Sequence, residues 1–295
     1  IQKEEVFKKY IDQWLGDNEV EFSRTAVYSF HAANAEKWSD KNVFLLGDAA
    51  HQMPPFMGQG MNSGCRDAEN LLWKINGVLK GLYSEKILHT YESERKPHVA
   101  RITRGAIKMG GIINAKSKII AFIRNTLLRT QSYFKGKENV FPVLNGNRLG
   151  SGVHKMPKIK NVSIERYYFN EINVRLRDGR VVSTDKVLEK NFGIILNNFN
   201  GNKKISEKNL DLINKHNFKI INITDSYDHS NCKGYIACEE THSDMEIYCD
   251  KYECNGVILR PDKYVFDLLN FKSADSLEII ISEVFDNIRE KIEFN

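Results

Sequence analysis

The sequence predicts an α/β protein with two domains, on three observations. In the first part of the chain, a short apolar run at residues 43–46 stops at a Gly-Asp turn, and a glycine- and proline-containing loop leads into a helical pattern. In the last part, apolar runs at 192–196 and 219–223 flank another helical pattern, as in a βαβ unit. Residues 134–160 between them are rich in glycine and asparagine, which indicates a linker. A chain of 295 residues is long enough for two hydrophobic cores.

The first thirty residues change from a helical to an alternating pattern. Apolar residues at helical spacing predict a helix over residues 4–15, and Gly16-Asp17-Asn18 ends it. Residues 19–30 alternate polar and apolar side chains, which predicts a strand that includes Tyr28 and Phe30. Packing within a sheet and contact with a ligand both remain open for these two rings.

The stretch from Asn42 to Lys74 organises the first domain. Its apolar run, Val43 to Leu46, predicts a strand buried on both faces, as in a parallel sheet. A helix should follow the loop, with a stop at Gly81. Its apolar positions at helical spacing are Ala68, Leu71, Leu72, Ile75, Val78 and Leu79.

Residue types in this stretch predict a binding site for a flat, highly oxygenated or anionic ligand. A carboxylate after a strand can accept hydrogen bonds from a polyol, and glycines let a flat ring approach the backbone. Amides at a helix start, with the positive end of the helix dipole, favour negative charge. The predicted site residues are Asp48, Pro54, Pro55, Gly58, Gly60, Met61 and Asn62. A loop that merely closes a βα unit is the plainer alternative, but the full run from the aspartate to the helix favours a ligand site.

Other polar residues near the loop are given supporting roles. His51 has no second ligand at a useful spacing, so a hydrogen bond within the loop is expected rather than a metal. Asp67, in the first turns of the helix, is expected to brace the loop. No Ser/His/Asp set and no paired carboxylates stand at a useful spacing, so no catalytic side chain is predicted.

Two further helical regions complete the first domain. Ser84 is the predicted cap of one, Pro97 should kink or restart it, and Gly110-Gly111 should break it. Its charged run, Glu92 to Lys96, favours a solvated face with ion pairs. Another helix, basic on one side, is expected over residues 116–130; a solvated face is favoured over contact with a membrane surface.

The sequence of the second domain predicts short strands alternating with helices. An Asp-Gly pair at 178–179 predicts a hairpin, and strands are expected at 192–196, 219–223, 247–248 and 256–259. Helices are expected over 206–216 and 275–292. Because the sequence has no CxxC, disulfide exchange is not expected, and the predicted role of this domain is packing or dimerisation.

Composition excludes several classes of protein. The net charge of +5 arises from interspersed charges, and no basic patch with aromatic residues predicts nucleic-acid binding. No apolar run approaches the roughly 20 residues of a membrane helix, and there is no signal-peptide pattern. Five cysteines without metal-ligand spacing indicate free thiols in the cytoplasm and no metal site.

Two strings in the first domain carry a family resemblance. GDAAHQMPPFMGQGMNSGCRDAENLLWK (47–74) and YESERKPHV (91–99) resemble the second flavin motif of single-component FAD-dependent aromatic hydroxylases. The branch they resemble is that of 3-(3-hydroxyphenyl)propionate hydroxylase. The resemblance implies that Asp48 bonds the ribityl chain and that the amides of residues 60–62 contact the flavin N1/O2 edge. It also implies that Pro54 and Pro55 line the flavin ring.

The same resemblance implies an architecture. Residues 1–133 would be the C-terminal part of a Rossmann-type FAD-binding monooxygenase core, 134–160 a linker, and 161–295 a thioredoxin-like domain. The Tyr91–Arg95 string would dock its helix on the core. Arg260-Pro261-Asp262-Lys263 resembles the RPDG-type turn of this branch, and Lys263 in place of glycine makes a tight turn less certain.

The implied activity is hydroxylation of a phenolic or other aromatic substrate with FAD, O₂ and NADH or NADPH. The family's GxGxxG turn, which binds the ADP half of FAD, occurs nowhere in this sequence. The sequence therefore resembles the C-terminal half of such an enzyme. It could be a truncated form or the mate of a separate N-terminal half chain. A binding or homodimerisation module without catalysis, and an inactive remnant, are the alternatives.

Overall fold

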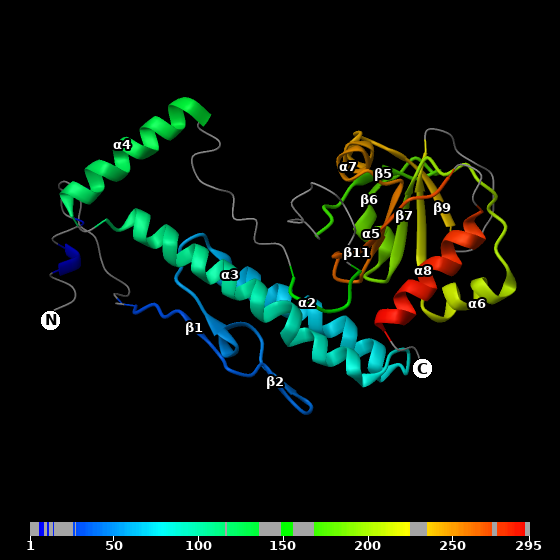
Figure 1. Cartoon of the computed structure of the whole chain (residues 1–295), viewed down its shortest axis with the longest axis horizontal. Helices are drawn as coiled ribbons and strands as arrows, with labels where there is room; N and C mark the ends of the chain where they lie inside the picture. Colours follow the sequence, from blue (N-terminus) through cyan, green and yellow to red (C-terminus); the bar gives the residue numbers. More distant parts are fainter. Residues whose placement is uncertain are drawn as a thin grey trace.

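The computed structural model describes residues 6–8, 11, 14, 26, 28–115, 117–135, 149–155, 168–224, 235–272 and 276–292. Two long helices lie side by side against a seven-stranded mixed sheet that carries helices on its faces (Figure 1). The predicted α/β class is confirmed.

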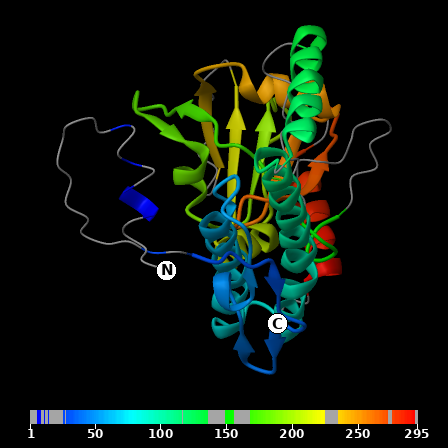
Figure 2. The same ribbon diagram turned by 90° about the vertical axis from the view of Figure 1, so that its left-hand side faces the viewer.

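The strands around the Gly-Asp turn are short and antiparallel. β1 (Ala33–Asn34) pairs with β4 (His51–Gln52), and β2 (Ser39–Asp40) pairs with β3 (Val43–Phe44). The strand predicted over residues 43–46 as buried in a parallel sheet is therefore wrong. Within the described residues its pairing partner is β2 alone, and Val43 is 66% exposed. Figures 1 and 2 show these pairs beside the long helices and away from the large sheet.

The long helices follow the sequence pattern at their ends but not throughout. The 3-10 turn η1 (Gly47–Ala49) leads through β4 to α2 (Gln59–Leu79), and Gly81, at φ +66°, follows it as predicted. Ser84 caps the 3-10 helix η2 (Glu85–His89), as predicted. The helix α3 (Thr90–Ile113) then runs through Pro97 and Gly110-Gly111, so the predicted break is wrong.

A remote segment covers the place where Pro97 interrupts the bonding of α3. The amide of Gly150 donates to the Glu94 carbonyl at 2.7 Å, and Ser93 Oγ donates to the Ser151 carbonyl at 2.7 Å. A Cβ added to Gly150 would lie 1.9 Å from the Ser93 carbonyl oxygen, so only glycine fits there. Residues 149–155, which fall in the predicted linker, therefore pack on α3.

The remaining predictions for the first part have mixed outcomes. Residues 6–8, 11 and 14 are helical, as expected, whereas the other residues of the predicted 4–15 helix lie outside the described part of the chain. Tyr28 and Phe30 lie in an exposed stretch that is not a strand, and residues 19–25 and 27 are not among the described residues. The helix expected over 116–130 is α4 (Lys118–Lys135), which extends away from the body (Figure 1). Ile119, Phe122 and Leu127 of α4 are exposed.

The large sheet is mixed. Its strand order is β11-β10-β7-β8-β9-β5-β6, and only β7-β8 and β8-β9 pair in parallel. Its strands are β5 (Asn173–Arg175), β6 (Val181–Ser183), β7 (Gly193–Asn197), β8 (Lys219–Ile223), β9 (Tyr235–Glu240), β10 (Gly256–Leu259) and β11 (Val265–Leu269). Its helices are α5 (Thr184–Leu188), α6 (Glu207–Lys215), α7 (Asp244–Tyr252) and α8 (Leu277–Lys291).

Most of these elements match the sequence prediction. The Asp-Gly hairpin (β5 and β6), the unit β7-α6-β8, the strand β10 and the terminal helix α8 are confirmed. The strand predicted at 247–248 is wrong, because both residues lie in α7. The turn of residues 260–263 does form: Lys263 donates its amide to the Arg260 carbonyl at 2.9 Å and adopts φ +64°.

Alternate residues of the sheet face two hydrophobic cores. Ile194 and Leu196 of β7 pack with α8, whereas Ile195 packs with α7 on the other face. The α8 core also includes Trp73 and Tyr83 from the first part of the chain. The sheet therefore shares this core with the end of α2 and with the segment that follows it. Leu71, Tyr91 and Val99 of the long helices pack in a separate cluster with Trp38 and Ala50.

Candidate flavin site

The turn that carries Asp48 is held against α2 by a close backbone contact. Gly47 adopts φ +54°, and a Cβ added to Gly64 of α2 would lie only 3.2 Å from the Gly47 Cα. These two glycines let the turn approach the helix more closely than side chains would allow. Asp48 itself is exposed, so its carboxylate can reach a ligand.

The start of α2 is open. Met57 (φ +80°) and Gly58 (φ +61°) turn the chain into the helix, and Gly58 is an N-cap without a capping side chain. A Cβ added to Gly58 would meet nothing within 4 Å, and Met61 is 78% exposed. The first amides of the helix thus have no capping side chain, at the positive end of the helix dipole.

Two local hydrogen bonds fix the backbone of the loop before the helix. The Gly58 amide donates to the Pro55 carbonyl at 3.0 Å, and Asn62 Nδ2 donates to the Gly58 carbonyl at 3.3 Å. Pro54 is half-buried, whereas Pro55 is exposed. An exposed carboxylate, an exposed proline and uncapped amides fit the sugar-alcohol chain and ring of a flavin. That these seven predicted residues bind FAD remains a prediction.

A buried carboxylate behind the loop fixes its position. Asp67 Oδ2 accepts the Gly47 amide at 3.1 Å and lies 2.7 Å from His51 Nε2, while Oδ1 accepts Arg95 Nε at 2.8 Å. Burial alone would raise the pKa of Asp67, but His51 and Arg95 outweigh it and lower the pKa. The bracing role predicted for Asp67 is confirmed, and His51 forms a hydrogen bond as expected, although its partner lies on α2 and not within the loop.

Asp67 belongs to a buried polar seam between α2 and α3 that the sequence reading missed. The seam consists of Ser63, Asp67, Asn70 and Lys74 on α2 and Glu94, Arg95 and His98 on α3, each at most 1% exposed. The α2 members stand at i, i+4, i+7 and i+11, the spacing of one helix face. That spacing was the available signal, but polar residues on a helix ordinarily indicate solvent.

The far end of the seam contacts the C-terminal sheet. Glu94 Oε1 and Oε2 each accept one guanidinium nitrogen of Arg260 at 2.9 Å, and Oε2 also accepts Lys74 Nζ at 2.9 Å. The solvated face predicted for residues 92–96 is thus wrong for Glu94 and Arg95, and the docking implied by the family resemblance is what the structure shows.

Charge pairing sets the protonation of this cluster. Burial would raise the pKa of Glu94, but Arg260 and Lys74 hold it well below its usual range. Burial lowers the pKa of the Lys74 ammonium to about 8, although Glu94 acts in the opposite direction. The cluster is therefore ionised near neutral pH.

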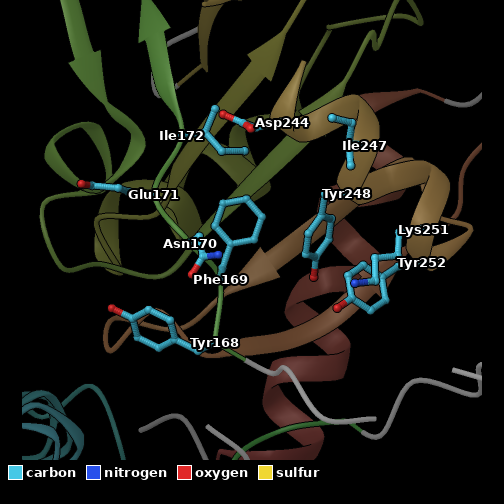
Figure 3. Close-up of a pocket in the computed structure, with 10 residues that line it drawn as sticks. All are labelled: Tyr168, Phe169, Asn170, Glu171, Ile172, Asp244, Ile247, Tyr248, Lys251 and Tyr252. Atoms are coloured by element: carbon cyan, nitrogen blue, oxygen red, sulfur yellow. The ribbon is translucent and has the colours of Figure 1, made fainter. Parts of the chain in front are cut away.

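A separate hollow lies on the C-terminal sheet (Figure 3). Its wall is formed by residues 168–172 and by side chains of α7. Tyr248 packs on Phe169 with ring centroids 5.1 Å apart and on Tyr252 at 4.6 Å. None of the predicted flavin-site residues lines this hollow.

Two negative findings apply to the described residues. They include no group of three His, Cys, Asp or Glu side chains placed to hold a metal ion. None of their helices combines the length and apolar character needed to span a membrane.

Two protein families match the chain in succession. Residues 2–106 match the FAD binding domain, and residues 167–279 match the HcaD C-terminal domain. The first range contains the open start of α2 and all the seam residues of α2 and α3, and the second contains Arg260.

Curated relatives support the same family. A probable NADH-specific resorcinol 4-hydroxylase from Rhodococcus jostii (strain RHA1) is 31% identical over 260 residues, which are 86% of this chain and 45% of that relative. A 3-(3-hydroxy-phenyl)propionate/3-hydroxycinnamic acid hydroxylase from Burkholderia cenocepacia (strain HI2424) is 27% identical over 90% of this chain and 50% of that relative. The chain thus spans about half the length of these relatives.

Solved structures agree at the level of the fold. The flavin-dependent monooxygenase PieE, in complex with FAD and substrate, is 19% identical, with a TM-score of 0.63 over 98% of this chain and 54% of its own. Aklavinone-11 hydroxylase, in a ternary complex with FAD and aklavinone, is 16% identical, with a TM-score of 0.59 over 90% and 46%. Together with the two domain matches, these findings identify the chain as a relative of the FAD-dependent aromatic hydroxylases.

Proposed function

We propose that this chain forms the ring-binding half of an FAD-dependent monooxygenase that hydroxylates a phenolic or related aromatic substrate. The observation that carries the proposal is the open start of α2 beside the exposed Asp48. The Gly47–Gly64 contact and Asp67 hold the two features together.

Six of the seven predicted residues would contact the flavin directly in this proposal. Asp48 accepts hydrogen bonds from the ribityl hydroxyls. The amides of Gly60, Met61 and Asn62 donate to the N1/O2 edge, where negative charge collects on reduction. Pro54 and Pro55 border the ring without competing N–H donors. Bound FAD would supply the redox and oxygen chemistry, with NADH or NADPH as reductant and O₂ as the oxygen source. The Rhodococcus relative, described as NADH-specific, favours NADH.

The proposal also requires a further stretch of protein. Val43, Met61 and Leu72 expose apolar side chains on the strand pair and α2, where a soluble protein ordinarily buries them. We propose that the part of the relatives that this chain does not match covers this surface and binds the ADP half of FAD, either in the same polypeptide or in a separate one. The residue that takes the phenol proton would come from that part.

A comparison of two flavins tests the ring half alone. If the chain binds only the isoalloxazine and ribityl groups, FMN and FAD should bind with similar affinities, because the ADP half contributes little. A titration that follows flavin fluorescence measures both affinities. Asp48→Ala should weaken both by about tenfold or more, the worth of one hydrogen bond to a charged group. Asp40→Ala, on the neighbouring hairpin, is the matched control and should leave both affinities unchanged. No flavin binding, or equal binding by Asp48→Ala, would overturn the proposal.

A further inference from the structure

The polar seam joins two distant places in the molecule. At one end Asp67 accepts the amide of Gly47, the residue before Asp48. At the other end Glu94 is clamped by Arg260, from the turn between β10 and β11. Glu94 and Arg95 are consecutive residues of α3, and Arg95 contacts Asp67. Buried, charge-assisted hydrogen bonds thus connect the C-terminal sheet with the Asp48 turn. The connection is continuous except between Glu94 and Arg95, which are joined through the backbone of α3.

We propose that the C-terminal domain positions the flavin loop through this seam, with Arg260 as the positioning residue. The inference rests on the proposed function for the loop, and it gives the C-terminal domain a role beyond packing. Displacement of Arg260 would move Glu94, turn α3, and release Asp67 from its present hold on Gly47 and His51.

The bonding of Arg260 leaves little freedom. Its Nε donates to Asp262 Oδ1 at 2.9 Å, and its terminal nitrogens donate to both Glu94 oxygens, to Asp262 Oδ2 and to the Val153 carbonyl. These are five hydrogen bonds, which equals the number of N–H donors in a guanidinium group. A planar fork with all donors used fixes orientation as well as distance.

The acceptor side is equally filled. Glu94 also accepts the Val153 amide at 2.6 Å and Asn70 Nδ2 at 2.7 Å, and Asn70 Nδ2 lies 3.0 Å from Asp262 as well. Asn70 is on α2, one turn after Asp67. Both helices of the seam are therefore bonded to the β10–β11 turn. Around Arg260, where all the guanidinium donors and both Glu94 oxygens are engaged, the buried network favours a single arrangement.

A simple fastening of one domain to another is the competing explanation. In that case, loss of the hydrogen bonds of Arg260 would loosen the β10–β11 turn and residues 149–155 but leave the Asp48 turn unchanged. The two explanations therefore differ in the amide protection of Gly47, some 200 residues away in the sequence.

Hydrogen exchange of the whole chain without flavin decides between them. Arg260→Lys keeps the charge but loses the fork, and we expect exchange at the Gly47 and Ala50 amides to rise at least tenfold, with Ile194 and Ile221 in the sheet core unchanged. Lys263→Met is the matched control, since it removes an ion pair with Asp185 from the same turn, keeps the backbone bond to Arg260, and removes no side-chain bond to a seam residue; exchange at Gly47 should stay unchanged. If Arg260→Lys does not fold, Asn70→Ser tests the same link from α2. Wild-type exchange at Gly47 in a folded variant would overturn the inference.

A flavin titration separates this inference from the proposed function. FMN affinity should fall about tenfold in Arg260→Lys if both are right. If wild type binds no flavin, the proposed function fails, whereas the exchange data still decide whether Arg260 controls the loop.

Discussion

At the scale of single residues, burial decides the chemistry more than residue type does. His216, at the end of α6, stacks on Tyr83 with ring planes 6° apart and centroids at 6.4 Å. Burial, together with the positive charges of Lys215 and Arg289, lowers the pKa of His216 to about 4. The imidazole is therefore neutral in the folded chain at pH values where it is half protonated in an unfolded one.

This shift predicts a pH dependence of stability. Between about pH 6.5 and pH 4 the unfolded chain binds the proton and the folded chain does not, so the free energy of unfolding should fall as the pH falls through that window. The loss should be on the order of 1–3 kcal/mol. His216→Phe keeps a ring but cannot titrate, so urea denaturation at pH 7 and pH 4.5 should show a smaller loss for the variant. Equal losses would contradict the assignment.

At the scale of elements, sequence patterns succeeded where local burial is regular. The last helix forms where it was predicted, and the apolar residues on one of its faces, among them Leu277, Val284 and Ile288, are buried in α8. Sequence patterns failed where a partner far away in the sequence determines whether a side chain is buried. Glu94 was assigned to a solvated face because its partner Arg260 lies 166 residues away. The polar stripe of α2 was missed for the same reason.

The loop itself could be predicted because its signal is local. An aspartate, two prolines, several glycines and a helix start follow one another within residues 48–60, and α2 begins where expected. The strand at residues 43–46 could not be predicted, because an apolar run does not reveal which strand will pair with it. In the described residues that partner is a two-residue hairpin strand.

The adjacent glycines of α3 offer a matched pair of variants. A Cβ added to Gly110 would lie 2.3 Å from the Phe56 ring, whereas one added to Gly111 meets nothing within 4 Å. Gly111→Ala should raise the free energy of unfolding by roughly 0.5–1 kcal/mol, because alanine favours a helix. Gly110→Ala should lower it by about 1–3 kcal/mol, because the Phe56 ring, which lies in the flavin loop, must move. Chemical denaturation measures both; the same sign for the two variants would contradict this packing.

At the scale of the whole molecule, the shared core joins regions that the sequence assigns to different domains. Trp73 of α2 packs edge-on against Phe192 with centroids 5.4 Å apart and against Tyr83 at 5.9 Å. The buried ion pair between Glu94 and Arg260 crosses the same boundary. Ring packing and a buried ion pair therefore cross the predicted boundary at residues 134–160, although the first part also has a hydrophobic cluster of its own.

This shared core predicts that the long helices and the sheet unfold together. Thermal unfolding should give a single transition, with coincident far- and near-ultraviolet circular dichroism curves. Trp73→Ala should destabilise that one transition by about 3–5 kcal/mol. Trp14→Ala, at a tryptophan that is 83% exposed, should shift it by less than about 0.5 kcal/mol. Two separate transitions, only one of them moved by Trp73→Ala, would contradict a common core.

The exposed isoleucine, phenylalanine and leucine side chains of α4 have a practical consequence for handling the protein. Salts such as ammonium sulfate strengthen contacts between apolar surfaces by being excluded from them. The purified chain should therefore precipitate at a low ammonium sulfate concentration and bind to a phenyl resin at modest ionic strength. A mild detergent that covers the apolar side chains of α4 should elute it.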